Sequence, residues 1–231
     1  MLHDKGRPGI AASLIGIALL GLPAQNLASA PAMAQSTPAA GHTPPLMERQ
    51  KEIALALSSC PPSVASKAAV YVLEKSGYVK VRDSENGFTA IVQHSMLISQ
   101  EPECLDAEGT RTLLPRFLKV AELRAEGKNP DEIKRVVADG LAKGVFQLPT
   151  RGITYMLSTE NVVPDEMHKG SVERFPPHVM FYAPDLTNAD IGAGGESSGG
   201  PAFVANEGTP NALIIVPVPE EAQAGPGHEH R

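Results

Sequence analysis

Two consecutive helices are encoded near the middle of the sequence, and they limit the folds open to the rest of it. Residues 110–126 place leucine, phenylalanine and alanine side chains at helical spacing, with Pro115 in the first turn. Asn129 and Pro130 then predict the N-cap and the first residue of a second helix, which ends before Gly144. The strands of the domain must therefore lie before or after this pair of helices.

Segments rich in β-branched and aromatic residues do lie on both sides of the pair, after an amphipathic helix expected at 46–58. The expected strands are 69–73, 78–82, 88–93, 152–158, 178–183 and 212–218. Asn86-Gly87 predicts a hairpin between the second and third strands, because both residues tolerate positive φ. Without regular βαβ alternation, this order predicts an α+β fold: a single domain with a mostly antiparallel sheet and the two central helices packed on it.

The two cysteines, Cys60 and Cys104, lie 44 residues apart and lack the CxxC spacing of zinc sites. We therefore expect a disulfide, which forms in oxidising compartments. In the chain-entropy model a loop of this length stabilises the fold by about 4 kcal/mol. The bond requires the two Cα atoms to lie within about 7 Å of each other.

The N-terminus has the parts of a secretory signal peptide: positive residues, an apolar run and small residues before a cleavage point. The apolar run at 10–22 is too short to span a bilayer, which disfavours the alternative of an uncleaved anchor. The small residues at 32–34 predict that residues 1–34 are removed and that Gln35 becomes the N-terminus. The mature protein is then expected in the periplasm or outside the cell, with no stable membrane anchor.

Composition divides the remaining chain into three parts. Residues 35–45 are rich in proline, alanine, serine and threonine and are expected to form a flexible leader. Residues 46–218 carry the helix and strand patterns and are expected to form the single α+β domain. Residues 219–231 are polar without apolar periodicity, which predicts a disordered tail.

Charge and motifs exclude several classes of function. The formal net charge is −6 and becomes −7 once residues 1–34 are removed, and lysines and arginines are not clustered. Nucleic-acid binding through bulk electrostatics is therefore not expected. The sequence has no phosphate-binding loop, HExxH, GxSxG or EF-hand pattern, so we expect no cofactor and no metal.

His178, Asp190 and Glu207 are the candidate catalytic residues. His178 follows two prolines at the start of an expected strand, and the two acids lie in nearby loops. A histidine beside a carboxylate can act as a general base, which would suit a small hydrolase-like or metal-dependent enzyme. The alternative is structural: the histidine bonds a backbone carbonyl and the acids cap turns. His94, which follows an apolar strand, is expected to be solvated.

Five runs of sequence resemble a family of uncharacterised exported bacterial proteins with no assigned activity. The runs are residues 77–92, 103–115, 153–158, 176–192 and 206–218. The resemblance covers most of residues 50–218 and implies no catalytic residue. Sequences of that family often have cysteine at the position of Ala90. If the bridge of those sequences joins that position to the one that matches Cys104, the pairing of Cys60 in this chain stays open.

Two classes of function remain. Polar residues are spread along turns without forming a recognised reactive set, which favours an exported, non-catalytic binding or interaction domain for an unidentified ligand or protein partner. The second class is the enzyme centred on His178, which requires an acid within about 4 Å of that histidine in a concave pocket.

Overall fold

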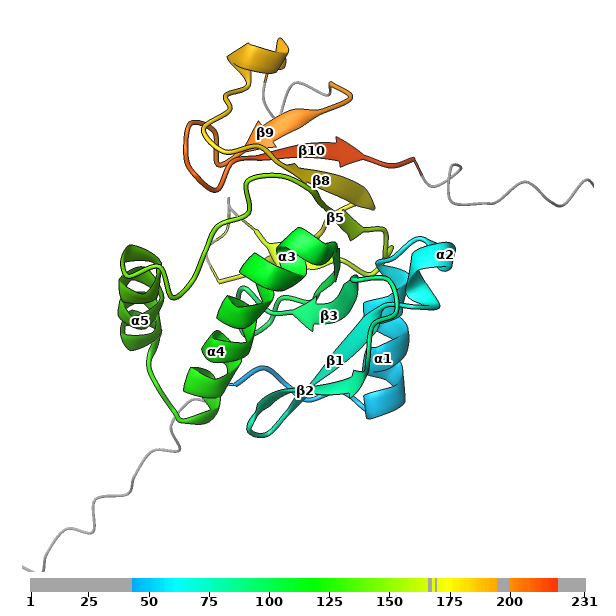
Figure 1. Cartoon of the computed structure of the whole chain (residues 1–231), viewed down its shortest axis with the longest axis vertical. Helices are drawn as coiled ribbons and strands as arrows, with labels where there is room; N and C mark the ends of the chain where they lie inside the picture. Colours follow the sequence, from blue (N-terminus) through cyan, green and yellow to red (C-terminus); the bar gives the residue numbers. More distant parts are fainter. Residues whose placement is uncertain (1–42, 166–167, 169, 195–199, 220–231) are drawn as a thin grey trace, which may run out of the picture. The chain divides into compact units, whose positions relative to one another are not determined.

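An eight-stranded sheet organises residues 43–165, 168, 170–194 and 200–219, the part of the chain that the computed structural model describes (Figure 1). The strand order is β2-β1-β3-β4-β5-β8-β10-β9, and β1 with β3 is the one parallel pair among the described strands. Their bounds are β1 Ala69–Glu74, β2 Gly77–Arg82, β3 Thr89–Gln93, β4 Glu101–Leu105, β5 Ile153–Met156, β8 His178–Tyr182, β9 Phe203–Ala205 and β10 Leu213–Pro217. A separate ribbon pairs β6 (Val162–Pro164) with β7 (Val172–Arg174).

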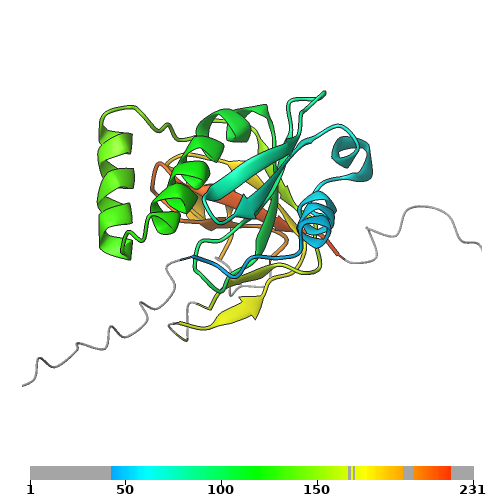
Figure 2. The ribbon, with the colours of Figure 1, turned by 90° about the horizontal axis from the view of Figure 1, so that it is seen from below.

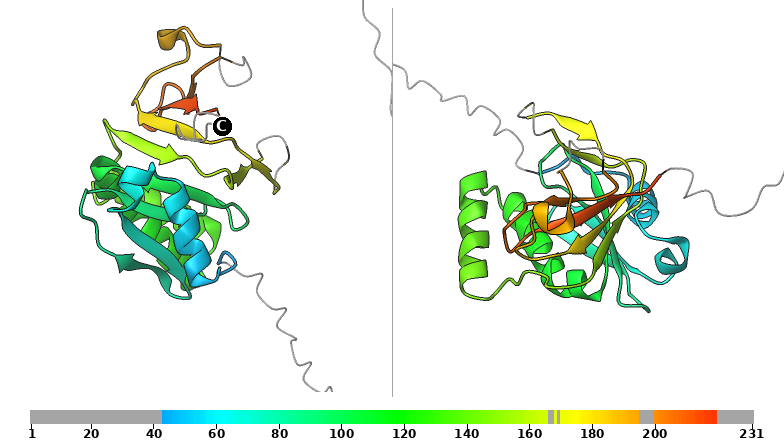
Figure 3. Two further views of the ribbon diagram at one scale, coloured as in Figure 1. Left: turned by 90° about the vertical axis from the view of Figure 1, so that its right-hand side faces the viewer. Right: turned by 90° about the horizontal axis from the view of Figure 1, so that it is seen from above.

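Helices cover both faces of the β2–β4 half of this sheet (Figure 2). On one face α1 (Arg49–Ser58) contacts β1, β3 and β4, and the short α2 (Pro62–Ala65) follows it. On the other face lie α3 (Ala107–Thr112) and α4 (Leu114–Ala125). The helix α5 (Pro130–Ala142) packs beside α4. The strands β8, β10 and β9 continue the sheet beyond the helices, and the 3-10 helix η1 (Ala189–Ile191) lies near the end of the sheet (Figure 3).

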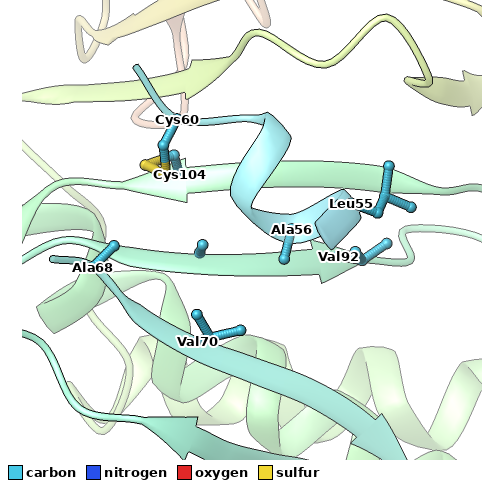
Figure 4. Close-up of a cluster of buried hydrophobic side chains, with 8 residues drawn as sticks. Leu55, Ala56, Cys60, Ala68, Val70, Val92 and Cys104 are labelled. Atoms are coloured by element: carbon cyan, nitrogen blue, oxygen red, sulfur yellow. A yellow bond between two sulfur atoms is a disulfide. The ribbon is translucent and has the colours of Figure 1, made fainter. Parts of the chain in front are cut away.

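Alternate residues of β3 face opposite helical layers, as the geometry of a strand requires. Ala90 and Val92 are fully buried in an apolar cluster that includes Ala56 of α1 (Figure 4). Ile91, between them, is fully buried in a second cluster with Phe117 of α4. The sheet therefore separates two cores, one under α1 and one under α4.

The predicted α+β fold with a mostly antiparallel sheet is confirmed. The single helix expected at 110–126 is instead the pair α3 and α4, because Pro115 has no N–H to donate to the carbonyl of Arg111. Asp106 begins α3 by accepting a hydrogen bond of 2.8 Å from the N–H of Gly109. Of the two central helices that were expected on the sheet, α4 lies on it and α5 packs against α4.

The hairpin expected at Asn86-Gly87 is wrong. A turn that ends at Gly77, with φ +119°, pairs β2 with β1, and the chain then crosses to the other side of β1, where β3 runs parallel to it. The Asn86 side chain donates to the carbonyl of Val64 at 3.0 Å and accepts from the N–H of Phe88 at 3.1 Å. Asn86 thus ties the crossing loop to α2 and does not form a two-residue turn.

Cys60 and Cys104 form the predicted disulfide, with their Cα atoms 5.2 Å apart. The bond joins the segment after α1 to β4, and both residues belong to the apolar cluster under α1 (Figure 4). Ala90 lies directly opposite Cys104 in the β3–β4 pairing. A disulfide is compatible with a location outside the cytoplasm.

The predicted signal peptide (1–34), most of the leader (35–45) and the tail (219–231, apart from Pro219) lie outside the described residues. No helix in the described ranges is long and apolar enough to cross a bilayer.

Candidate functional site

His178 is buried at the first position of β8 and has local partners. Its Nδ1 lies 2.8 Å from the carbonyl oxygen of Pro176, and its ring meets that of Phe175 edge-on with centroids 4.7 Å apart. Burial lowers the pKa of His178, against the opposite effect of the Pro176 carbonyl. This environment disfavours the charged imidazolium and anchors the ring to its own loop.

Asp190 and Glu207 are brought near each other by the loops that follow β8 and β9. Asp190 accepts hydrogen bonds from the Oγ1 and N–H of Thr187, at 2.7 and 2.9 Å. Glu207 accepts from the N–H and Nδ2 of Asn188, both at 2.9 Å. These bonds lower the pKa of both carboxyls, and those of Glu207 to Asn188 join the two loops.

The length of β8 separates His178 from the two acids. The strand runs from His178 to Tyr182, and the loops with Asp190 and Glu207 lie at the Tyr182 end, where β9 ends and β10 begins. Four strand residues rise about 13 Å. Within the described ranges no hydrogen bond or ion pair joins the histidine to either acid, and no three His, Cys, Asp or Glu side chains form a candidate metal site. The enzyme hypothesis gains no support from this arrangement.

A different part of the molecule holds a cavity of about 1030 Å³, beside α4 and α5. Its volume is at the upper end of the range for small-molecule sites. The lining residues come from positions 43, 44, 46, 73–75, 78, 93–98, 116, 117, 120, 121, 124, 125, 128, 130, 133, 134, 137, 138 and 141. The cavity therefore joins the chain before α1, the β1–β2 turn, the β3–β4 loop and two helices.

Apolar side chains at helical spacing on α4 and α5 form one side of the cavity. This apolar wall consists of Phe117, Val120, Ala121, Ile133, Val137 and Leu141. On α5 its members recur every fourth residue and so lie on one stripe of the helix. A capping box of Asn129 and Glu132 begins α5, and Gly140 is its one fully buried residue. The stripe on α5 thus borders the cavity more than it fills a core.

The β3–β4 connection forms a cover loop, residues 94–99, over the cavity. Its apolar positions 96–98 line the cavity. Ser99 stabilises the loop through hydrogen bonds within it. Its carbonyl is hydrogen-bonded to Nδ1 of His94, and its Oγ accepts from the N–H of Met96 at 3.0 Å. Polar groups at its two ends therefore hold an apolar segment in the cavity lining.

Arg124 of α4 attaches the cover loop to the helix. Its guanidinium donates to the carbonyl of His94 at 2.7 Å and to that of Ser95 at 3.1 Å. The expectation that His94 is solvated is wrong: the side chain is buried and lines the cavity. Burial lowers the pKa of His94, and the charge of Arg124 acts in the same direction.

Two buried carboxyls lie on the face of the sheet that α4 covers. Glu103 pairs across the sheet with Ile91, which packs under α4, and Glu101 is two positions away on the same face. Burial raises the pKa of Glu103 to about 8; the charge of Glu101 raises it further, and that of Arg116 opposes the rise. Burial also raises the pKa of Glu101, against hydrogen bonds from Ser95.

Arg116 and Arg124 place two cations in the cavity lining, two turns apart on α4. Arg116 lies over the ring of Phe117, with its guanidinium carbon 5.7 Å from the ring centroid. In the part of the chain that is described, neither guanidinium has a carboxylate oxygen within 4.0 Å. The cavity thus combines an apolar wall with positive charge.

Tyr78 and Glu52 extend this buried polar region toward α1. The Tyr78 hydroxyl donates to the carbonyl of Val92 at 2.5 Å, and Glu52 accepts from the N–H of Leu73 at 2.7 Å. Burial raises the pKa of Tyr78 and raises that of Glu52 to about 7. Glu52 is held by a backbone donor and not by a cation.

Sequence reasoning missed this cavity because its residues come from distant segments. Two local signals exist: the two-residue spacing of Glu101 and Glu103, which places both on one face of a strand, and the eight-residue spacing of Arg116 and Arg124, which places both on one side of a helix. Neither signal indicates which strand faces which helix.

Comparison of the chain with protein families, curated proteins and solved structures found no match.

Proposed function

We propose that this is an exported, non-catalytic binding protein that holds an apolar small molecule in the cavity between α4, α5 and the cover loop. The observation that carries the proposal is the apolar wall formed by two helices, α4 and α5, of which α5 packs on α4. Sites of this kind bury most of a ligand's apolar surface and orient it with a few polar groups.

The polar groups of the cavity favour binding over catalysis. His94 is bonded to the carbonyl of Ser99 and not to a carboxylate, so no acid orients it as a general base. Arg124 is bonded to two backbone carbonyls, which fixes the cover loop. These contacts position the walls of a binding site.

A bulky substitution in the apolar wall tests the proposal. Val137 is half-buried and lines the cavity, whereas its neighbour Val136 is 39 % exposed and does not. We expect Val137→Trp to weaken binding of the neutral fluorescent probe N-phenyl-1-naphthylamine about tenfold or more, because the indole fills space the probe needs. Val136→Trp is the matched control and should bind the probe as the natural protein does. Equal affinities in all three proteins, or no binding by the natural protein, would contradict the proposal.

Export is supported by the disulfide, which forms in oxidising compartments. When the full chain is produced in a bacterium that secretes proteins, we expect the purified product to begin at Gln35, because the small residues at 32–34 match a cleavage site. Intact-mass measurement of the product checks this. Recovery of a chain that still begins at Met1, with both thiols reduced, would overturn the export proposal.

A further inference from the structure

Arg116 differs from Arg124, the other arginine of the cavity lining, in what its guanidinium contacts. Arg124 is committed to the carbonyls of His94 and Ser95. Arg116 is half-buried and makes no hydrogen bond or ion pair with the described residues; its partners are the ring of Phe117 and the charge of Glu103. A guanidinium has five donors in a planar fork that matches a carboxylate.

Charge around Arg116 favours an anion. Glu103 is the carboxyl that faces it, and no oxygen of Glu103 comes within the 4.0 Å of an ion pair with Arg116. Burial raises the pKa of Glu103 to about 8, so this carboxyl is largely protonated at neutral pH. Glu101 is the second acid nearby and Arg124 the second cation. The cavity lining also carries Lys75, Lys128, Lys134 and Glu74, so its net charge is positive, and an anionic head group would offset part of that charge.

The side of α4 that lines the cavity extends from Arg116 to Ala125. The nine rises between these two residues span about 14 Å of helix. Val120 and Ala121 lie between them, and α5 returns beside α4 (Figure 1). An unbranched hydrocarbon chain laid along the two helices would bury its surface against this wall.

We propose that the ligand of this cavity is a single-chain amphiphile with a terminal carboxylate, its head group on Arg116 and its chain along the apolar wall of α4 and α5. This inference rests on the proposed function, since it assigns a ligand class to the same cavity. Charge complementarity argues for it: a desolvated, apolar-sided site that presents a guanidinium without a protein carboxylate selects an anionic head.

Displacement of N-phenyl-1-naphthylamine by two matched ligands tests the head group. Decanoate and 1-decanol have the same chain length and differ in the charge of the head. We expect the natural protein to bind decanoate at least tenfold more tightly than 1-decanol at pH 7, since hydrogen bonds to charged groups are worth about 1.5–3 kcal/mol. If both displace the probe equally, the carboxylate inference fails while the proposed function stands. If the probe itself does not bind to the natural protein, the proposed function fails.

Variants of Arg116 test whether this residue causes the preference for decanoate over 1-decanol. Arg116→Gln should weaken decanoate binding about 10- to 100-fold and leave 1-decanol within about twofold. Arg116→Lys keeps the charge and should retain part of the preference. Arg135→Gln, which removes an exposed arginine of α5 outside the cavity lining, is the matched control and should change neither ligand. Each variant is compared by thermal unfolding first. Equal weakening of both ligands in folded Arg116→Gln would overturn the assignment of Arg116.

Discussion

Loss of the Cys60–Cys104 bond is expected to lower the free energy of unfolding by about 4 kcal/mol. The bond closes a loop with a sequence separation of 44, and a loop of this length removes about that much conformational entropy from the unfolded chain. For a domain of this size the melting temperature should fall by roughly 8–16 °C. Thermal unfolding of the oxidised protein, of the same protein reduced with dithiothreitol, and of the double variant Cys60→Ala/Cys104→Ala measures the effect.

Comparison of the reduced protein with the double variant separates the effect of the bond from that of the packing of the sulfur atoms. Cys60 and Cys104 are buried in the apolar cluster under α1, so alanine at both positions also removes apolar contacts. The reduced natural protein keeps both sulfur atoms and should show most of the loss by itself. A reduced protein that melts within about 2 °C of the oxidised one would contradict the assignment of this stability to the bond.

Replacement of Glu103 by glutamine is expected to remove a large part of the loss of stability that the natural protein shows as the pH rises from 4.5 to 8. In the fold, burial holds the pKa of Glu103 at about 8, whereas the unfolded chain ionises near 4.5. Unfolding between these values releases a proton, so the fold loses stability as the pH rises and the loss is complete above the folded pKa. The contribution of Glu103 to this loss of stability is on the order of 4 kcal/mol.

The pH window separates Glu103 from other buried groups. Burial lowers the pKa of His94 and of His178 below 6.5, so these histidines destabilise the fold only on the acidic side. Glu52, with a pKa raised to about 7, acts in the same direction as Glu103 and is present in both proteins. The difference between Glu103→Gln and the natural protein in urea unfolding at pH 4.5 and 8 therefore reports Glu103. Glu126→Gln, at an exposed position, is the control; a Glu103→Gln curve that is parallel to the natural one would refute the prediction.

The elements themselves could be predicted from local sequence. The capping residue Asn129 and Pro130 begin α5 as predicted, and the segments expected at 178–183 and 212–218 are β8 and β10. These features depend on a few neighbouring residues, through capping, backbone preference and side-chain period. The strand β4 was missed because Pro102 between two glutamates is unfavourable in a strand read by itself, although the sheet buries all five of its residues.

The candidate site depended on tertiary structure. His178 and the acids Asp190 and Glu207 follow one another in the sequence, yet a strand of five residues holds the histidine at one end and the acids at the other. Conversely, Arg116 meets Glu103 and His94 meets Arg124 only because α4 packs on the face of the sheet that carries β4.

The sequence by itself indicated most of the helices and strands and the α+β class, and it made a Cys60–Cys104 disulfide the expected pairing, because these features depend on residues and spacings along the chain. Only the tertiary structure decided that β3 pairs in parallel with β1, that α5 packs on α4, and that a cavity lies between them. The physical reason is that pairing and packing depend on burial shared between distant segments, and a local pattern shows which side of an element is apolar but not which partner covers it.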